Sequence, residues 1–158
     1  MELLTLRDFK DEDLPVFDAW LHRQHVAKWY GDLDEWLGEV QNRSSGYSWI
    51  HHFIASFGGR DIGFCQYYEY AKGGEDWHGN VDVPGTYSID YLIGEPEYLG
   101  KGLGREMIKK LLDLISSLPD AKRVIAQPEG ENAASCNTLL SAGFEYDADN
   151  KLYLFPIR

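Results

Sequence analysis

The stretch of sequence that decides the fold is Tyr98-Leu99-Gly100-Lys101-Gly102-Leu103-Gly104-Arg105. It lies between a predicted strand at 87–93 and a predicted amphipathic helix at 104–117. Glycine at every second position lets the backbone approach a ligand closely, and the helix that follows points its free N–H groups and positive dipole end at the loop. A pyrophosphate fits such a loop, although the three glycines by themselves are equally typical of a tight turn.

Two common phosphate-binding motifs do not fit this loop. A P-loop requires Gly-Lys followed by Ser or Thr, but Lys101 is followed by Gly102-Leu103. A dinucleotide fingerprint follows the first strand of a doubly wound sheet and requires an acid at a strand end about 20 residues later. Here Asp120 falls in a predicted turn, and the loop follows four predicted strands. The sequence therefore predicts a different nucleotide ligand.

On these residues the chain resembles the GCN5-related N-acetyltransferase (GNAT) superfamily, whose phosphate loop is written (Gln/Arg)-x-x-Gly-x-(Gly/Ala). Two of the three loop glycines fill the glycine places, while the first position departs, being Glu97 or Leu99. The similarity continues at Asn132 and at Ala142-Gly143-Phe144, where the superfamily opens and closes a helix. It covers most of the chain and is strongest from 87 to 144.

Within the superfamily, Ile89-Asp90, the run 99–104 and Trp29-Tyr30-Gly31 are similar to aminoglycoside 6'-N-acetyltransferases. The resemblance implies transfer of acetyl from acetyl-CoA (CoA) to a primary amine, the 6'-amine of an aminoglycoside, by direct attack in a ternary complex. It implies an α/β (α+β) fold. We expect a single GNAT-like domain over residues 1–158, with a central mixed, mostly antiparallel twisted sheet of about seven strands flanked by helices.

The hydrophobic pattern predicts where the elements lie. We expect strands at 4–9, 48–57, 61–70, 87–93, 123–126, 144–146 and 152–157, and helices at 11–21, 34–42, 104–117 and 132–142. Asp11 is the expected N-cap of the first helix. Segments 25–36 and 71–85 are expected to be ligand-contacting loops, because both mix aromatic and acidic residues.

The composition disfavours several classes of protein. The 158 residues include 15 Lys plus Arg and 26 Asp plus Glu, a net charge of −11, which disfavours nucleic acid and anionic membranes and favours cationic partners. The resemblance implies that this partner is a cationic small-molecule amine. No stretch approaches the length of a membrane span, and the N-terminal pattern is not that of a signal peptide, so we expect a cytoplasmic protein. The two cysteines indicate neither a disulfide framework nor a metal site. Monomer and homodimer stay open.

Acetyl transfer to an amine requires a proton acceptor, a donor for the developing oxyanion and a proton source for the departing thiolate. We expect Asp90 to take the amine proton; the alternative is that Asp90 is only a solvated residue on the outer face of the strand. Glu69 is a weaker candidate for the same role. The superfamily often has a thiolate-protonating tyrosine at the place of Leu139, which cannot donate. Tyr91, a water or solvent is left for that step, and Tyr91 is the second expected catalytic residue.

The resemblance also implies two sets of binding residues. The expected cofactor-binding residues, which include the backbone of the strand at 87–93, are Tyr91, Leu92, Ile93, Leu99, Gly100, Lys101, Gly102, Leu103, Gly104, Arg105 and Asn132. Carboxylates for ammonium groups and aromatic planes for sugar rings are the expected substrate-binding residues: Trp29, Tyr30, Asp32, Glu69, Glu75, Asp76, Trp77, Asp82, Asp90 and Gln127. Gln127 departs from the acid that the resembled enzymes tend to carry before this proline.

Two other functions remain open at this point. A GNAT enzyme for another amine, such as a polyamine, a siderophore hydroxylamine or a protein N-terminus, would share the phosphate loop. A non-catalytic module that binds acyl-CoA or a polycation would share everything except a competent proton relay. The five histidines are expected to have surface or structural roles.

Overall fold

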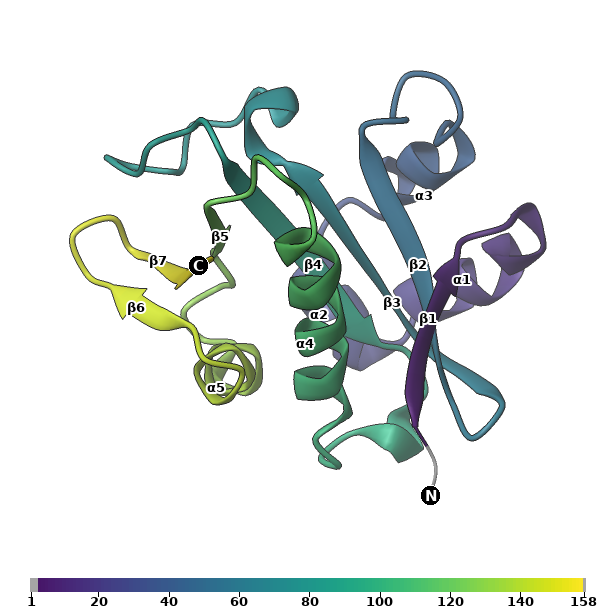
Figure 1. The fold of residues 1–158 in the computed structure, drawn as a ribbon. Coiled ribbons are helices and arrows are strands. Elements are labelled where there is room, and N and C mark those ends of the chain that lie inside the picture. Colours follow the sequence, from purple (N-terminus) through teal and green to yellow (C-terminus); the bar gives the residue numbers. More distant parts are fainter. Residues whose placement is uncertain (1–2, 158) are drawn as a thin grey trace.

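One seven-stranded sheet with the order β1-β2-β3-β4-β5-β7-β6 organises the computed structural model, which describes residues 3–157 (Figure 1). The β4–β5 pair is parallel and the other five pairs are antiparallel, which confirms the predicted mixed sheet. The strands are β1 (Leu4–Asp8), β2 (Ile50–Phe57), β3 (Arg60–Glu69), β4 (Thr86–Ile93), β5 (Arg123–Ala126), β6 (Glu145–Asp147) and β7 (Leu152–Pro156).

Helices cover both faces of the sheet. Figure 1 shows α4 in front of the sheet and α1 to α3 behind it, with α5 beside β6 and β7. The α-helices are α1 (Leu14–Leu21), α2 (Gln24–Tyr30), α3 (Leu33–Gln41), α4 (Leu103–Ser116) and α5 (Ala133–Ser141). Short 3₁₀ turns occur at η1 (Asp11–Asp13), η2 (Tyr70–Gly73) and η3 (Pro96–Tyr98).

Strand alternation produces a core on each face. Phe64 and Leu92 point toward the α1–α3 layer and pack with Phe17 and Trp20. Residues an odd number of positions away, such as Ile89, three before Leu92, pack against α4 on the other face. This alternation decides which side chains of β3 and β4 share a compartment.

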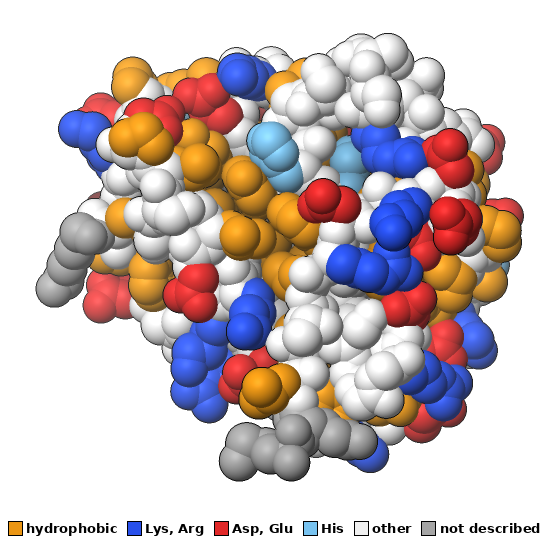
Figure 2. Space-filling model, turned by 45° about the vertical axis from the view of Figure 1, so that its right-hand side comes forward, with side chains coloured by type: hydrophobic (Ala, Val, Ile, Leu, Met, Phe, Trp, Pro, Cys, Tyr) orange, Lys and Arg blue, Asp and Glu red, His pale blue; other side chains and the backbone are white. Residues whose placement is uncertain are grey.

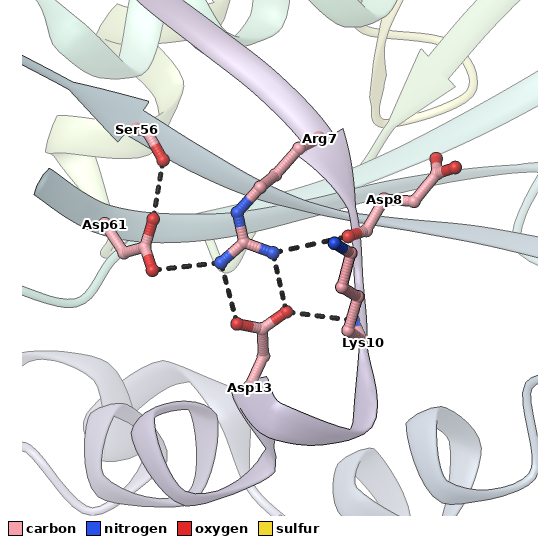
Figure 3. A network of polar contacts seen from close by, with 6 residues as sticks. All are labelled: Arg7, Asp8, Lys10, Asp13, Ser56 and Asp61. Carbon is pink, nitrogen blue, oxygen red and sulfur yellow. Dashed lines mark hydrogen bonds and ion pairs between the residues drawn. The ribbon is translucent and has the colours of Figure 1, made fainter. Parts of the chain in front are cut away.

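A network around Arg7 ties the first strand to its neighbours (Figure 3). The guanidinium donates to both oxygens of Asp13 at 2.8 and 2.7 Å and to Asp61 at 2.9 Å, while Ser56 donates to Asp61 at 2.6 Å. Asp13 also accepts from the backbone N–H of Lys10 at 2.9 Å. The network therefore fixes β1, η1 and the β2–β3 hairpin together.

Two local predictions were wrong. Residues 24–30 form α2 rather than a loop. The prediction missed this helix because its seven residues, with Val26 as the one buried apolar side chain, are too few to show a helical period. Asp11 is not a cap, since the chain enters α1 through the η1 turn and the carboxylate that accepts a backbone N–H there is Asp13. The first predicted helix begins three residues late, at Leu14, and the other predicted strands and helices are confirmed to within two residues.

The surface carries charges of both signs. On the face shown in Figure 2, Lys and Arg side chains lie beside Asp and Glu side chains, with an apolar area between them. That face therefore has no continuous basic or acidic patch. Within residues 3–157, no helix combines the length and apolar character that a membrane crossing requires.

Candidate active site

The two parallel strands at the centre of the sheet separate after a short pairing. Thr86, Tyr87 and Ser88 pair with β5, whereas β4 continues to Ile93 and β5 ends at Ala126. The edge of β4 beyond Ser88 therefore lacks a strand partner on that side. The carbonyl of Ile93 accepts a hydrogen bond from His25 Nε2 at 2.8 Å, and that of Tyr91 accepts one from the Tyr30 hydroxyl.

A cavity of about 550 Å³ occupies this opening. It runs from the start of α4, past the free edge of β4, to the N-terminal part of α5 and the aromatic side chains of α2. Predicted cofactor residues that line it are Tyr91, Leu92, Ile93, Leu99, Gly104 and Asn132. Predicted substrate residues that line it are Trp29, Tyr30, Glu75, Trp77, Asp90 and Gln127.

The glycine loop meets this cavity at the first turn of α4. Gly100 and Gly102 have φ of +73° and +77°, and a Cβ on either would meet no atom within 4 Å. The open space fits a ligand lying against the backbone, and the positive φ excludes most other residues. The side chains of the loop contribute less than its backbone to this space, because Leu103 is buried in the core and Lys101 and Arg105 are exposed to solvent.

Asp90 lies on the face of β4 that looks toward α1 to α3. Its Oδ2 accepts from Gln66 Nε2 at 2.9 Å. Burial in the wall of the cleft raises the pKa of Asp90 to about 6; the Gln66 amide opposes this shift, and the negative charge of Glu75 adds to it. A carboxylate whose pKa lies this close to neutrality is suited to accept and release a proton.

Tyr91 projects from the opposite face of β4. Its hydroxyl lies 2.6 Å from Ser135 Oγ on α5, and both residues line the cavity. Burial raises the pKa of Tyr91 above its ordinary value, so the hydroxyl keeps its proton at neutral pH. Leu139 is fully buried in the core. The Tyr91–Ser135 pair therefore supplies hydroxyl groups in a region where Leu139 supplies none.

A second cavity of about 430 Å³ opens next to the first and shares Tyr30, Trp36, Tyr68, Glu75 and Asp90 with it. Acidic and aromatic side chains dominate its wall, and those not in the first cavity include Asp32, Glu35, Glu39, Tyr47 and Trp49.

Two carboxylates of this second cavity are held in distinctive environments. The Glu75 carboxylate is fixed by the hydroxyl of Tyr68 at 2.6 Å and the indole N–H of Trp77 at 2.9 Å. Burial and the charges of Asp90, Glu35 and Glu75 raise the pKa of Glu39 to about 7. The cavity therefore concentrates negative charge that has no basic partner among its lining residues.

Three predicted substrate residues lie outside both cavities. Glu69 belongs to the sheet face opposite Asp90, because it stands an odd number of positions from Gln66, and it pairs with Lys72 at 3.4 Å. Asp76 and Asp82 are exposed in the loop before β4. Five predicted cofactor residues are likewise not in the lining, namely Gly100, Lys101, Gly102, Leu103 and Arg105, and the loop reaches the cavity at Leu99 and Gly104.

Sequence reasoning missed several residues of the site. His25 and Trp36 line the first cavity, Ser135 contacts Tyr91, and Glu39 lines the second cavity. The helical position of Glu39 on α3 carried no signal, because the face of that helix toward the sheet was not predicted. Among residues 3–157, no three His, Cys, Asp or Glu side chains are grouped to hold a metal ion.

Comparison with known proteins agrees with this geometry. The family model described as acetyltransferase (GNAT) domain matches residues 10–152. The aminoglycoside N(6')-acetyltransferase type 1 of Klebsiella pneumoniae is 30% identical over 152 residues, covering 90% of this chain and 74% of that protein. The crystal structure of aminoglycoside acetyltransferase AAC(6')-Ib in complex with coenzyme A and kanamycin has a TM-score of 0.81 at 26% identity, covering 98% of this chain and 95% of that one.

The splayed strands, the glycine loop and the helix behind it define an acyl-CoA-dependent transferase. The chain belongs to the GNAT acetyltransferase family, as the resemblance implied. It is an N-acetyltransferase, and its family uses acetyl-CoA; the related crystal structures contain coenzyme A.

Proposed function

We propose that this enzyme acetylates the 6'-amine of an aminoglycoside by direct attack within a ternary complex, and that residues 1–158 form one catalytic domain. The observation that carries the proposal is the position of Asp90, which lines both the cavity at the free edge of β4 and the acidic cavity beside it. A cation held in the acidic cavity lies next to a carboxylate suited to accept its proton.

The cofactor side rests on backbone groups. The open space beyond Gly100 and Gly102 and the N-terminus of α4 fit a pyrophosphate, with Asn132 and Leu99 on the cavity wall. The edge of β4 that lacks a strand partner offers the backbone N–H groups of Tyr91 and Ile93 to an extended arm and to the thioester oxygen, while the carbonyls of these two residues accept from Tyr30 and His25. Acetyl-CoA, when bound, supplies the acyl carbon that the amine attacks.

Asp90 handles the proton of the acceptor. An ammonium group must lose a proton before its nitrogen can attack, and Asp90, with a pKa of about 6, is ionised at neutral pH and able to take it. The proton then passes to solvent through the open acidic cavity. Oδ2 is occupied by Gln66, so Oδ1 is the oxygen available to the amine.

Tyr91 acts on the departing thiolate of coenzyme A. Its hydroxyl lies 2.6 Å from Ser135 Oγ on the α5 side of β4. With Ser135 as the donor in that contact, the proton of Tyr91 is free to be donated to the sulfur that leaves. Because its pKa is raised, Tyr91 stays protonated and acts as a hydrogen-bond donor over the working pH range.

The substrate class follows from the lining of the two cavities. Glu75, Glu39 and Asp32 attract several ammonium groups, and Trp29, Trp36 and Trp49 offer flat faces to sugar rings. The relatives named above are aminoglycoside N(6')-acetyltransferases, and solved relatives hold kanamycin or ribostamycin. Trp77 adds a further aromatic wall while it orients Glu75.

The test is release of free CoA thiol from acetyl-CoA with purified protein and a panel of amines. We expect release with kanamycin, tobramycin and amikacin, and none with spermidine or a peptide amine. Release with spermidine or the peptide alone would move the acceptor to another amine class. Binding of acetyl-CoA without release from any amine would indicate a binding module.

A further inference from the structure

A buried histidine lies two hydrogen bonds away from Asp90. His52 of β2, Gln66 of β3 and Asp90 of β4 are direct cross-strand neighbours in the sheet register. His52 Nδ1 lies 3.0 Å from Gln66 Oε1, and Gln66 Nε2 lies 2.9 Å from Asp90 Oδ2. His52 is only 6% exposed and Gln66 2%, so water does not compete for the contact between these two side chains.

The chemistry of the three side chains determines where the hydrogens are. An ionised carboxylate only accepts hydrogen bonds, so Gln66 must turn its NH₂ group toward Asp90. Its carbonyl oxygen then faces His52, which must carry its hydrogen on Nδ1. Nε2 of the neutral ring is left as a bare acceptor, and it is the one buried side-chain nitrogen or oxygen within residues 3–157 that has no partner.

The surroundings keep His52 neutral and in place. Its ring stacks on Phe64 with centroids 6.0 Å apart. Burial lowers the pKa of His52 to about 4; the Gln66 contact opposes that shift, and the charges of Arg43 and His51 add to it. The ring therefore acts as a fixed hydrogen-bond donor to Gln66 and not as a proton carrier.

We propose that His52 and Gln66 are positioning residues that hold Asp90 in its ionised form, with Oδ2 fixed and Oδ1 left for the acceptor amine. A reversed Gln66 amide would set its oxygen against the carboxylate, and the N–H of His52 disfavours that reversal because it would then face an NH₂ group. The inference rests on the proposed role of Asp90 as proton acceptor.

Among residues 3–157, no Lys or Arg side chain faces Asp90 from the elements packed around it. The groups that do are Tyr68 from β3, Tyr30 from α2, Glu39 from α3, Glu75 from the loop after η2, and Tyr91 beside it on β4. These are neutral or negative at pH 7. The Gln66 amide is thus the contact that lowers the pKa of Asp90 against burial and Glu75.

A matched pair of variants tests the positioning. In His52→Asn the amide nitrogen is bonded to Cγ, where Nδ1 was, whereas in His52→Gln it lies one bond farther out, near the place of Nε2. We expect the acidic limb of kcat/KM against pH to stay in place in His52→Asn. The midpoint of that limb should rise by about half a pH unit in His52→Gln and by about one unit in Gln66→Leu. At a pH below the midpoint, kcat/KM should therefore fall about threefold in His52→Gln and about tenfold in Gln66→Leu.

Three further measurements distinguish the possible failures. Unfolding midpoints and acetyl-CoA affinity show whether a variant merely loses structure. If His52 had only a structural role, both His52 variants would lose stability to the same extent and the acidic limb of the pH profile would not move. That result would overturn the proposal. Nitrogen-15 NMR of the wild-type enzyme should show hydrogen on Nδ1 of His52, and hydrogen on Nε2 would overturn it independently of activity. If Asp90→Asn is impaired while Gln66→Leu keeps the wild-type limb, only the positioning is wrong; a wild-type rate in Asp90→Asn removes the proposed base itself.

Discussion

Asp90 and Tyr91 are adjacent in sequence yet lie on opposite faces of β4, and one cavity reaches both. Asp90 accepts from Gln66 at 2.9 Å on the α1–α3 side, and Tyr91 contacts Ser135 at 2.6 Å on the α5 side. Because β5 leaves β4 after Ser88, the cavity passes around the free edge of the strand. Under the proposed function, the strand separates the side where the amine binds from the side where the thiol leaves.

The first prediction concerns Asp90. Asp90→Asn removes the proton acceptor, so we expect kcat/KM for kanamycin to fall about 100-fold with acetyl-CoA affinity unchanged. In the wild type, kcat/KM should fall as the pH decreases through about 6, because protonated Asp90 cannot accept. Asp76→Asn makes the same chemical change at an exposed site and should keep the wild-type rate. Equal rates for the two variants would move the role elsewhere.

The second prediction concerns the departing thiolate. Tyr91→Phe removes the hydroxyl beside Ser135, and we expect kcat to fall about 100-fold while KM for both substrates stays nearly constant. Adding Leu139→Tyr should not rescue it, because the side chain at 139 is fully buried in the core. Steady-state kinetics check both. Rescue by Leu139→Tyr would show that the α5 position retains the role.

The third prediction concerns the glycine loop. Gly102→Val forces a branched side chain into a φ of +77° and fills the open space beyond it, so we expect acetyl-CoA binding to be lost. Gly59→Val is a matched control, because Gly59 in the β2–β3 turn has a φ of +80° and equally open space. Both should lose similar stability, and calorimetry should show binding only in the control. Retained binding in Gly102→Val would contradict the pyrophosphate assignment.

The fourth prediction concerns proton release on binding. Because the pKa of Glu39 is raised to about 7, part of the enzyme carries a protonated Glu39 near neutrality, and a polycation favours the carboxylate. Aminoglycoside affinity should therefore increase from pH 6 to pH 8, with protons released in calorimetry across buffers. Glu39→Gln should weaken binding and abolish most of that release, whereas exposed Glu12→Gln should do neither. An unchanged release in Glu39→Gln would exclude Glu39 from the cation site.

The fifth prediction concerns the Arg7 network. Arg7→Met leaves Asp13 buried without its partner, and we expect a loss of about 2 kcal/mol of unfolding free energy. Hydrogen bonding to Arg7 lowers the pKa of Asp13, so this contribution is present above the unfolded pKa of about 3.9 and is lost at lower pH. As the pH falls below the unfolded pKa and through the lowered pKa of Asp13, the stability of the variant should approach that of the wild type. Arg60→Met, at an exposed ion pair, should cost under about 1 kcal/mol at pH 7; equal losses would contradict the account.

The long elements of this fold were predictable because their patterns are strong. The period of Met107, Ile108, Leu111 and Leu112 indicates α4, and the glycines at 58 and 59 between two aromatic runs indicate the β2–β3 hairpin. The α2 helix was not predictable from period, since it has only seven residues and stops at Tyr30, just before Gly31 with its positive φ.

The site was predictable in kind more than in detail. Asp90 and Tyr91 were predicted because the resemblance to the family points to this strand. That one cavity reaches both of them depends on where β5 leaves β4, which no local pattern encodes. Glu69 looks equivalent to Asp90 in sequence, and only the sheet register places it on the other face. The contacts of Ser135 and His52 join elements far apart in the chain, so they appear only in the folded structure.

The most direct test of the account is the position of the new acetyl group on kanamycin after reaction with acetyl-CoA. Two-dimensional NMR and mass spectrometry of the purified product identify the nitrogen that was modified. The account predicts one acetyl group, on the 6'-nitrogen, and its loss in Asp90→Asn. Acetylation at another amine, or no product from an enzyme that binds both ligands, would contradict it.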